Sequence, residues 1–187
     1  MKNESFIKIS WIARFLGIAL IVVCCFLPFA SGLTMSSGGT SKSYGPLFSF
    51  FFMGKLSSGV ASYQAKTVAV LPLIGYIFVI ISLLLLLLSF LKYRNNRISP
   101  FLRMAALLFT LAFSVMFLCS HRSLSDVLAY AFLSKYSDAV GNTIYKNTTL
   151  DFAVYGMSVF GFLASLSNFI SLVFDSTIDK LRAGYYR

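Results

Sequence analysis

Charged residues are scarce in this sequence, because Asp, Glu, Lys and Arg together make up only 12% of its 187 residues. A soluble domain carries about 25% charged residues, which cover its surface with groups that water solvates well. Hydrophobic residues make up 58% of the chain, so much of the folded surface must face an apolar medium. The composition therefore excludes an ordinary soluble domain and indicates a protein of the lipid bilayer.

Side chains that perform chemistry are equally few. His121 is the single histidine, so a zinc motif of the His-Glu-x-x-His type cannot be written, and no Gly-rich phosphate loop occurs. Asp126, Asp138 and Asp151 lie outside the apolar stretches, but their spacing specifies no acid–base pair. We therefore expect no catalytic residues, no metal and no cofactor, and a protein that is not an enzyme.

The long polar segments lack cysteine altogether. Cys24, Cys25 and Cys119 lie in or at the edge of apolar stretches, which argues against a small secreted scaffold held by disulfides. We interpret these cysteines as small apolar packing residues. A Cys25–Cys119 disulfide near the outer leaflet is the alternative.

Negative charge is scarce as well, with 6 acidic against 16 basic residues and a formal net charge of +10. In a soluble protein this excess would suggest nucleic acid as a partner. Here the basic residues flank the apolar stretches and form no stripe, so we expect no nucleic-acid partner. They indicate orientation in the membrane and contacts with anionic membrane lipids.

Long apolar stretches are what the sequence has in abundance. Four are long enough to cross a hydrocarbon core about 30 Å thick, which takes about 20 helical residues. They cover residues about 9–29, 68–91, 101–119 and 152–174. Arg14 and Arg103 lie near the ends of the first and third stretches, and we expect their side chains to extend out to the headgroups. The predicted fold class is an all-α membrane protein, a four-transmembrane-helix bundle.

The basic residues also predict the orientation. Ten of the 16 Lys and Arg residues fall on the side that holds both termini and the short connector Lys92–Arg103. Because cytoplasmic segments are enriched in Lys and Arg, both termini are expected in the cytoplasm, in a multi-pass protein of the plasma membrane. A cleaved signal peptide ending at Gly32 is the alternative, but the apolar stretch is long for one.

Two outer segments, about 30–67 and 120–151, predict a small extracytoplasmic cap. In the first, the apolar octet Pro46–Met53 is too short to span; a buried strand, a re-entrant element and an interfacial aromatic segment all fit it. In the second, apolar residues at helical spacing predict one amphipathic helix over Leu124–Val140, with short β-strands as a further option. Its polar face makes Asp126, Lys135 and Asp138 candidate partner-facing residues.

Small and weakly polar residues form a stripe on every predicted span. Such residues let helix backbones approach closely in lipid. The candidate helix-packing residues are Ala13, Gly17, Gly75, Ser82, Ser89, Thr110, Ser114, Gly161, Ser165 and Asn168. Asn168 is interpreted as a packing hydrogen bond, with a substrate or ion contact as the alternative. Asp175, beyond the last span, is expected to pair locally with basic residues of the same helix.

Some motifs of the spans resemble those of uncharacterised prokaryotic four-span membrane proteins. The segments that carry the resemblance are Phe26-Leu27-Pro28-Phe29, Leu71-Pro72-Leu73-Ile74-Gly75, Tyr155-Gly156 and Gly161-Phe162-Leu163-Ala164. The resemblance covers only the spans and implies no activity. The loop lengths are also similar to those of claudin-like tetraspans, but the tryptophans and cysteine pair of their first loop are absent, so this similarity is one of layout.

These features favour a non-enzymatic membrane scaffold or accessory subunit. About 70 outer residues look ordered without carrying chemistry, whereas the cytoplasmic segments are short. The expected partners are membrane lipids and either another membrane protein or a second copy of this chain. A transporter or channel component is the second hypothesis, and a membrane enzyme acting at the outer leaflet is the third.

Overall fold

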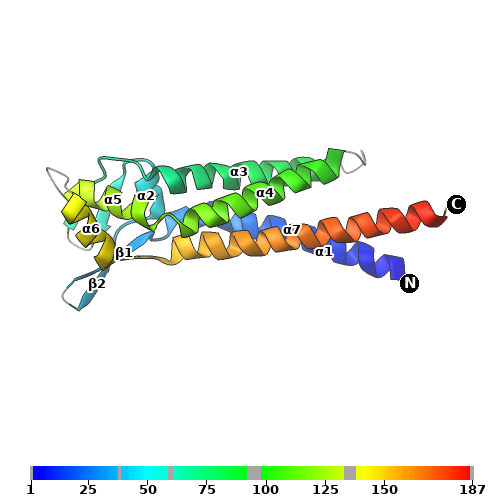
Figure 1. Ribbon diagram of the computed structural model, residues 1–187, viewed down its shortest axis with the longest axis horizontal. Coiled ribbons are helices and arrows are strands. Elements are labelled where there is room, and N and C mark those ends of the chain that lie inside the picture. Colours follow the sequence, from blue (N-terminus) through cyan, green and yellow to red (C-terminus); the bar gives the residue numbers. More distant parts are fainter. Residues whose placement is uncertain (1, 38, 59–60, 92–97, 133–137, 186–187) are drawn as a thin grey trace.

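Four long helices form a bundle, and the shorter elements form a cap at one end of it (Figure 1). The computed structural model describes residues 2–37, 39–58, 61–91, 98–132 and 138–185. The long helices are α1 (Lys2–Phe26), α3 (Val70–Leu91), α4 (Ile98–Leu118) and α7 (Phe152–Tyr185). Both ends of the chain lie at the end of the bundle opposite the cap. The predicted fold class is confirmed.

The long helices are sufficiently long and apolar to cross a membrane. Their candidate spans are Ser5–Phe29, Val70–Ser89, Ser99–Leu118 and Phe152–Ile178. Large apolar side chains such as Ile12, Leu84 and Leu108 are exposed on the outside of the bundle. In water such a surface would aggregate, whereas lipid solvates it and helices satisfy their own backbone groups. The chain is therefore a multi-pass membrane protein.

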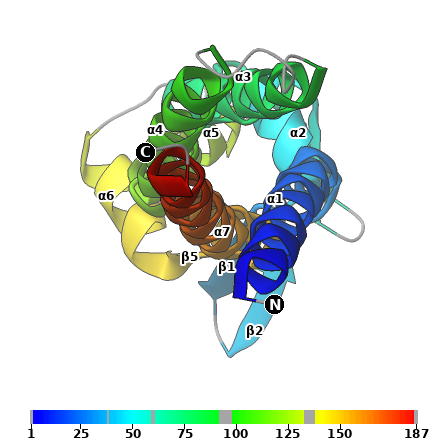
Figure 2. The same ribbon diagram turned by 90° about the vertical axis from the view of Figure 1, so that its right-hand side faces the viewer.

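The bundle is built from two helix pairs. α1 packs along α7, α3 packs along α4, and α4 also packs extensively on α7; the contact between α1 and α3 is smaller and completes the ring (Figure 2). Small residues make these contacts close. A Cβ atom on Gly75 would lie 3.1 Å from the Phe117 ring, and one on Gly161 would lie 2.5 Å from the Phe113 ring. Glycine at these positions lets α3 and α7 approach α4.

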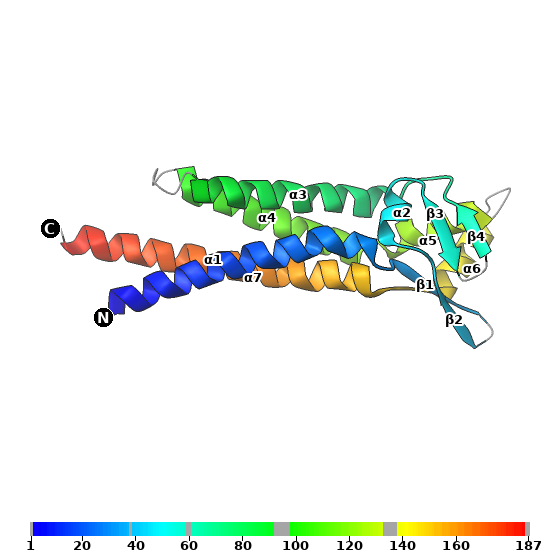
Figure 3. The same ribbon diagram turned by 180° about the vertical axis from the view of Figure 1, so that it is seen from behind.

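Among the residues that the structure describes, the cap contains two small antiparallel sheets and three short helices (Figure 3). One sheet has the order β2-β1-β5 and the other pairs β3 with β4. The strands are β1 (Leu33–Ser37), β2 (Thr40–Ser43), β3 (Lys55–Ser58), β4 (Ala61–Gln64) and β5 (Thr148–Leu150). The helices are α2 (Leu47–Phe51), α5 (His121–Phe132) and α6 (Asp138–Asn147), and a 3₁₀ turn η1 (Leu27–Phe29) follows α1. β5 thus joins the two outer segments, because it pairs with β1 across the sequence.

The prediction of one amphipathic helix over Leu124–Val140 is wrong. α5 ends at Phe132 and α6 begins at Asp138, and the two helices pack on each other. Buried side chains on α5 and buried Ile144 on α6 belong to the same core. Two shorter helices can turn both apolar faces to that core, which one straight helix cannot do.

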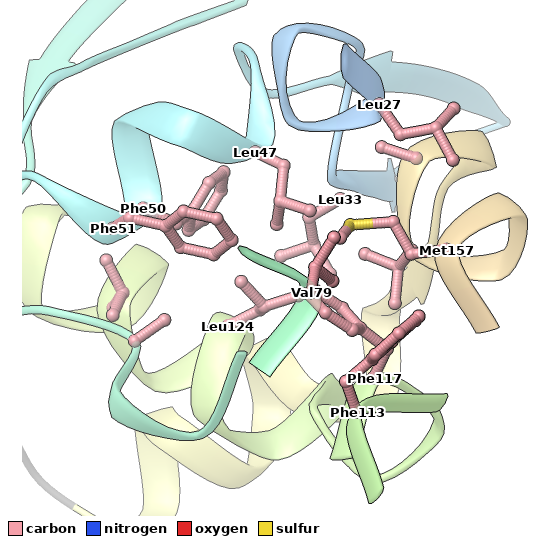
Figure 4. Close-up of a cluster of buried hydrophobic side chains, with 14 of the residues drawn as sticks. Leu27, Leu33, Leu47, Phe50, Phe51, Val79, Phe113, Phe117, Leu124 and Met157 are labelled. Atoms are coloured by element: carbon pink, nitrogen blue, oxygen red, sulfur yellow. The ribbon is translucent and has the colours of Figure 1, made fainter. Parts of the chain in front are cut away.

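The apolar octet forms the short helix α2, which begins after Pro46. Leu47, Phe50 and Phe51 of α2 are buried. They pack in the cluster shown in Figure 4, which also contains Phe117 of α4 and Met157 of α7. Cap and bundle therefore share one hydrophobic core, and the cap has a fixed position on the spans.

Candidate functional site

Three charged side chains from three different spans meet inside the bundle. Arg14 of α1 forms an ion pair with Oδ2 of Asp175 on α7, and Nη1 of Arg103 on α4 lies 2.6 Å from the same oxygen. Each arginine side chain is only 4% exposed, and that of Asp175 is 18% exposed. The expectation that both arginines extend to the headgroups is wrong, because a carboxylate inside the bundle provides a closer partner.

Two serines complete this network. Ser10, one turn before Arg14 on α1, donates a hydrogen bond of 2.5 Å to Oδ1 of Asp175. Ser171, one turn before Asp175 on α7, accepts hydrogen bonds from Arg14 Nε (3.2 Å) and from Arg103 Nη1 (3.1 Å). The spacing of four residues places each serine on the same helix face as its charged neighbour. Asp175 thus pairs with side chains of two other helices, whereas the side chains of Lys180 and Arg182, its expected partners within α7, lie outside those that the structure describes.

The network can do two things physically. Opposite charges attract strongly in a low-dielectric interior. If one partner is removed, the remaining charges stay buried without a partner, and their lost hydration costs free energy. The network therefore holds α1, α4 and α7 together at the end of the bundle away from the cap. Ionisable groups within a membrane protein also commonly mark a path for an ion or a polar substrate.

Asn168 lies one turn from Ser171 toward the cap, and it is 1% exposed. Within the described part of the chain, neither Oδ1 nor Nδ2 of its amide has a hydrogen-bond partner. The amide packs against Gly17, where an added Cβ atom would lie 2.7 Å from Oδ1. The structure thus places Asn168 at the α1–α7 contact, but without the interhelical hydrogen bond that we expected there. An unsatisfied buried amide costs about 1–3 kcal/mol, which makes it an unusual feature.

The other predicted packing residues also lie between helices. Ser165 on α7 donates a hydrogen bond of 2.8 Å to Thr110 on α4, and Ser158 donates one of 3.0 Å to the carbonyl of Ser114. All ten candidates are buried: Ala13, Gly17, Gly75, Ser82, Ser89, Thr110, Ser114, Gly161, Ser165 and Asn168. The α4–α7 seam is therefore polar along most of its length.

A second polar centre, Asp151, joins the cap to the start of α7. Its Oδ2 accepts hydrogen bonds from the hydroxyls of Ser31 (2.6 Å), Thr34 (2.7 Å) and Ser43 (3.1 Å). Its Oδ1 accepts one from the backbone N–H of Phe152 (2.7 Å). Burial opposes ionisation of this carboxyl, but the hydrogen bonds outweigh burial and hold the pKa of Asp151 below its usual value. The spacing of Asp151 in the sequence gives no sign of this role.

His121 is part of a small polar network in the cap. Its Nε2 lies 3.1 Å from the hydroxyl of Thr148, which lies 2.8 Å from the hydroxyl of Ser125. Its ring packs on that of Tyr145, with 4.4 Å between centroids. Burial lowers the pKa of His121, although the hydrogen bond with Thr148 acts in the opposite direction. Because Thr148 is buried, the arrangement resembles a packing network more than a nucleophile and base open to a substrate.

The predicted partner-facing residues lie on the cap surface as far as they are described. Asp126 forms an ion pair of 3.2 Å with Arg122 along α5, and Asp138 is exposed at the start of α6. Lys135 lies outside the described residues. All three cysteines are free, so the alternative Cys25–Cys119 disulfide is not formed.

Sequence reasoning missed the Arg14–Asp175–Arg103 network because each residue looked ordinary alone. The available signal was the pairing of a serine four residues before a charge, which occurs at Ser10–Arg14 and again at Ser171–Asp175. Two such pairs on different spans indicate polar faces that can meet. Comparisons of the chain with protein-family models and with curated proteins give no match.

Proposed function

We propose that this protein is a non-enzymatic membrane scaffold or accessory subunit that binds another membrane protein through its cap. The observation that supports it best is the β1–β2 hairpin, which projects from the cap while its base is held by Asp151 (Figure 1). All four side chains of β2 are exposed. We place the cap outside the cytoplasm and both termini inside it, in the plasma membrane, which is the orientation that the basic residues predict.

An exposed hairpin adds little to the stability of its own protein. Two strands alone are at best marginally stable in water, so the hairpin depends on β5 and on the hydrogen bonds to Asp151. A surface that is already ordered loses less conformational entropy when a partner binds. The fixed hairpin is therefore suited to contact, and the charges of Asp126 and Asp138 can add selectivity for one partner.

Site-specific photo-crosslinking in cells tests this function. A photoreactive residue at Ser41, on the exposed strand β2, should give a discrete crosslinked protein product. The same residue at Leu108, exposed on α4 within its span, is the matched control and should give only lipid adducts. Equal product patterns at the two positions would contradict the proposal.

The second arm uses Asp151→Ala, which removes the acceptor for three hydroxyl groups of the hairpin and its surroundings. We expect the crosslink from Ser41 to fall several-fold while the protein remains inserted. Asp126→Ser with Asp138→Ser should also weaken partner retention, with little change in stability, because exposed charges contribute little. An unchanged crosslink in both variants would count against the cap as the binding surface.

A transporter or channel component is the second candidate, favoured by the Arg14–Asp175–Arg103 network and by the unpartnered amide of Asn168. Asn168→Leu should then abolish flux in a reconstituted complex without changing crosslinking from Ser41. An enzyme ranks third. It would require His121→Ala to lower an activity about 10²–10⁴-fold, whereas the contact function leaves this variant nearly silent.

A further inference from the structure

Three apolar side chains are exposed together at the base of the cap. Phe29 is 65% exposed, Phe52 57% and Met53 46%. Phe48 links the two phenylalanines, because its ring stacks on that of Phe29 with 5.4 Å between centroids and meets that of Phe52 in a tilted contact at 4.5 Å. We call Phe29, Phe48, Phe52 and Met53 the aromatic ledge. Such a grouped exposed apolar surface indicates a contact with something apolar.

The ledge lies at the level where the spans end. Phe29 is the last residue of the first span, which places it at the boundary between hydrocarbon and headgroups. Ring contacts through Phe48 connect Phe29 to Phe52. The Phe51 ring lies 6.4 Å from the rings of both Phe48 and Phe52, and it also packs against Tyr76 of α3, with 5.6 Å between centroids; Tyr76 is within the second span. α2 therefore lies next to the cap-side ends of the first two spans, in contact with η1 and α3.

The backbone holds the tip of the ledge in place. Met53 has φ of 52°, a left-handed conformation that is uncommon for a residue other than glycine. The Gln64 side chain donates a hydrogen bond to the Met53 carbonyl, and the Gly54 N–H donates one of 2.9 Å to Ser49. The turn directs the chain from α2 straight into β3, so Phe52 and Met53 are kept outside the core. Local strain of this kind persists where the surrounding structure fixes it.

Charge next to the ledge agrees with a lipid partner. Lys55 and Lys66 are both exposed at the ends of the β3–β4 hairpin that follows α2. Aromatic side chains with nearby lysines are typical of the membrane interface, where rings sit at headgroup level and ammonium groups meet phosphates. A protein partner would instead usually meet a ledge with fewer lysines, because lysine is depleted from interface cores.

We propose that the aromatic ledge is inserted in the leaflet on the cap side, where Phe52 and Met53 contact acyl chains and Lys55 contacts lipid phosphates. The cap then rests on the bilayer at α2 as well as on the four spans. This contact is independent of the partner-binding function of the cap, because the purified protein in a bilayer suffices to test it.

Tryptophan quenching in lipid nanodiscs is the decisive experiment. Trp11→Phe removes the native tryptophan, and Phe52→Trp then places a single probe on the ledge. Tyr130→Trp in the same background is the matched control, since Tyr130 is exposed on α5 of the cap. Lipids brominated near the headgroup quench probes in the interface, and iodide quenches probes in water.

The probe at position 52 should be quenched several-fold more by brominated lipid than the probe at position 130, and several-fold less by iodide. Met53→Trp in the same background should behave like Phe52→Trp and guards against a local folding defect of one variant. Equal iodide quenching at positions 52 and 130, with no effect of brominated lipid, would overturn the proposal and make the ledge a protein-docking surface.

Discussion

Asp175 forms ion pairs with two arginines at once, so three helices depend on this one carboxylate. Its carboxylate is the acceptor for Arg14, Arg103 and Ser10. The serine and arginine partners come from α1 and α4, whereas Asp175 is on α7. A change here therefore acts on three helices at the same time.

Asp175→Asn should lower the free energy of unfolding by about 3–5 kcal/mol, because it leaves two buried guanidinium groups without their carboxylate. Thermal unfolding in mild detergent measures this. Ser176→Ala, at the exposed neighbouring position, is the control and should change stability by less than about 0.5 kcal/mol.

A triple variant makes the test sharper. Arg14→Met, Arg103→Met and Asp175→Leu together should recover most of the lost stability, since apolar residues of similar volume can replace a buried ion pair without net cost. If Asp175→Asn is as stable as the unmodified protein, the arginines reach the headgroups after all.

His121 gives the cap a pH dependence with a definite sign. Burial lowers its pKa in the folded protein below the ordinary value of 6.5, so the unfolded chain binds the proton more readily. The contribution of neutral His121 is therefore fully present above about pH 6.5 and is lost as the pH falls toward the folded pKa. Asp151 acts in a separate pH range. Because its pKa is lowered in the folded protein, its contribution to stability is present above about pH 3.8 and is lost at more acid pH.

We expect the unfolding temperature of the cap to fall between neutral pH and about pH 5. His121→Gln keeps a hydrogen-bonding side chain next to Thr148 and should flatten this slope. Hydrogen exchange of α5 and β5, corrected for intrinsic rates, locates the effect in the cap. A slope that His121→Gln leaves intact would assign the pH dependence to another group.

At this residue scale the sequence predicted some positions and misjudged others. Burial of Ser82, Thr110 and Asn168 could be predicted, because a small or polar residue in an apolar stretch is cheapest when it faces another helix. The partners of Arg14 and Arg103 could not, because they depend on how α1, α4 and α7 are rotated relative to one another. A single sequence carries the period of each helix but not that rotation.

At the scale of elements, helix approach depends on missing side chains. Gly161→Leu should lower the free energy of unfolding by about 1–3 kcal/mol or more, because even a Cβ atom there would clash with the Phe113 ring and with Ser114. Gly17→Leu should act similarly through Asn168. Thermal unfolding in detergent measures both.

The control for these variants has to face lipid. Leu85 is unsuitable, because it packs partly against the core. Leu84 is 54% exposed, so Leu84→Ala should cost far less than either glycine variant. Equal losses in all three variants would mean that the glycines do not mark close helix contacts.

The spans and the cap elements differ in how far the sequence predicts them. Twenty apolar residues specify a membrane helix almost regardless of context. Short cap elements depend on contacts instead: α2 forms where Leu47, Phe50 and Phe51 enter the shared core, and β5 forms where the chain meets β1. Such long-range pairings leave little trace in local periodicity.

At the scale of the whole molecule, the direction of the bundle in the membrane is the property to measure. In a background without the native cysteines, Ser41→Cys on the cap should react with an impermeant thiol reagent on intact cells. Ser5→Cys, exposed near the N-terminus, should react only after the membrane is opened. The reverse pattern would place the cap in the cytoplasm and contradict the orientation that the basic residues predict.

The shared carboxylate of Asp175 also has a consequence in time. The ribosome makes Arg14 first, Arg103 much later and Asp175 only with the fourth span. Until the fourth span is synthesised, both guanidinium groups enter the bilayer without their carboxylate, at a cost of up to about 2.5–3.5 kcal/mol each. A chain that lacks α7 thus carries two unpaired arginines within its spans, which cellular quality control can recognise. When α7 is inserted, Asp175 pairs with both arginines in one step.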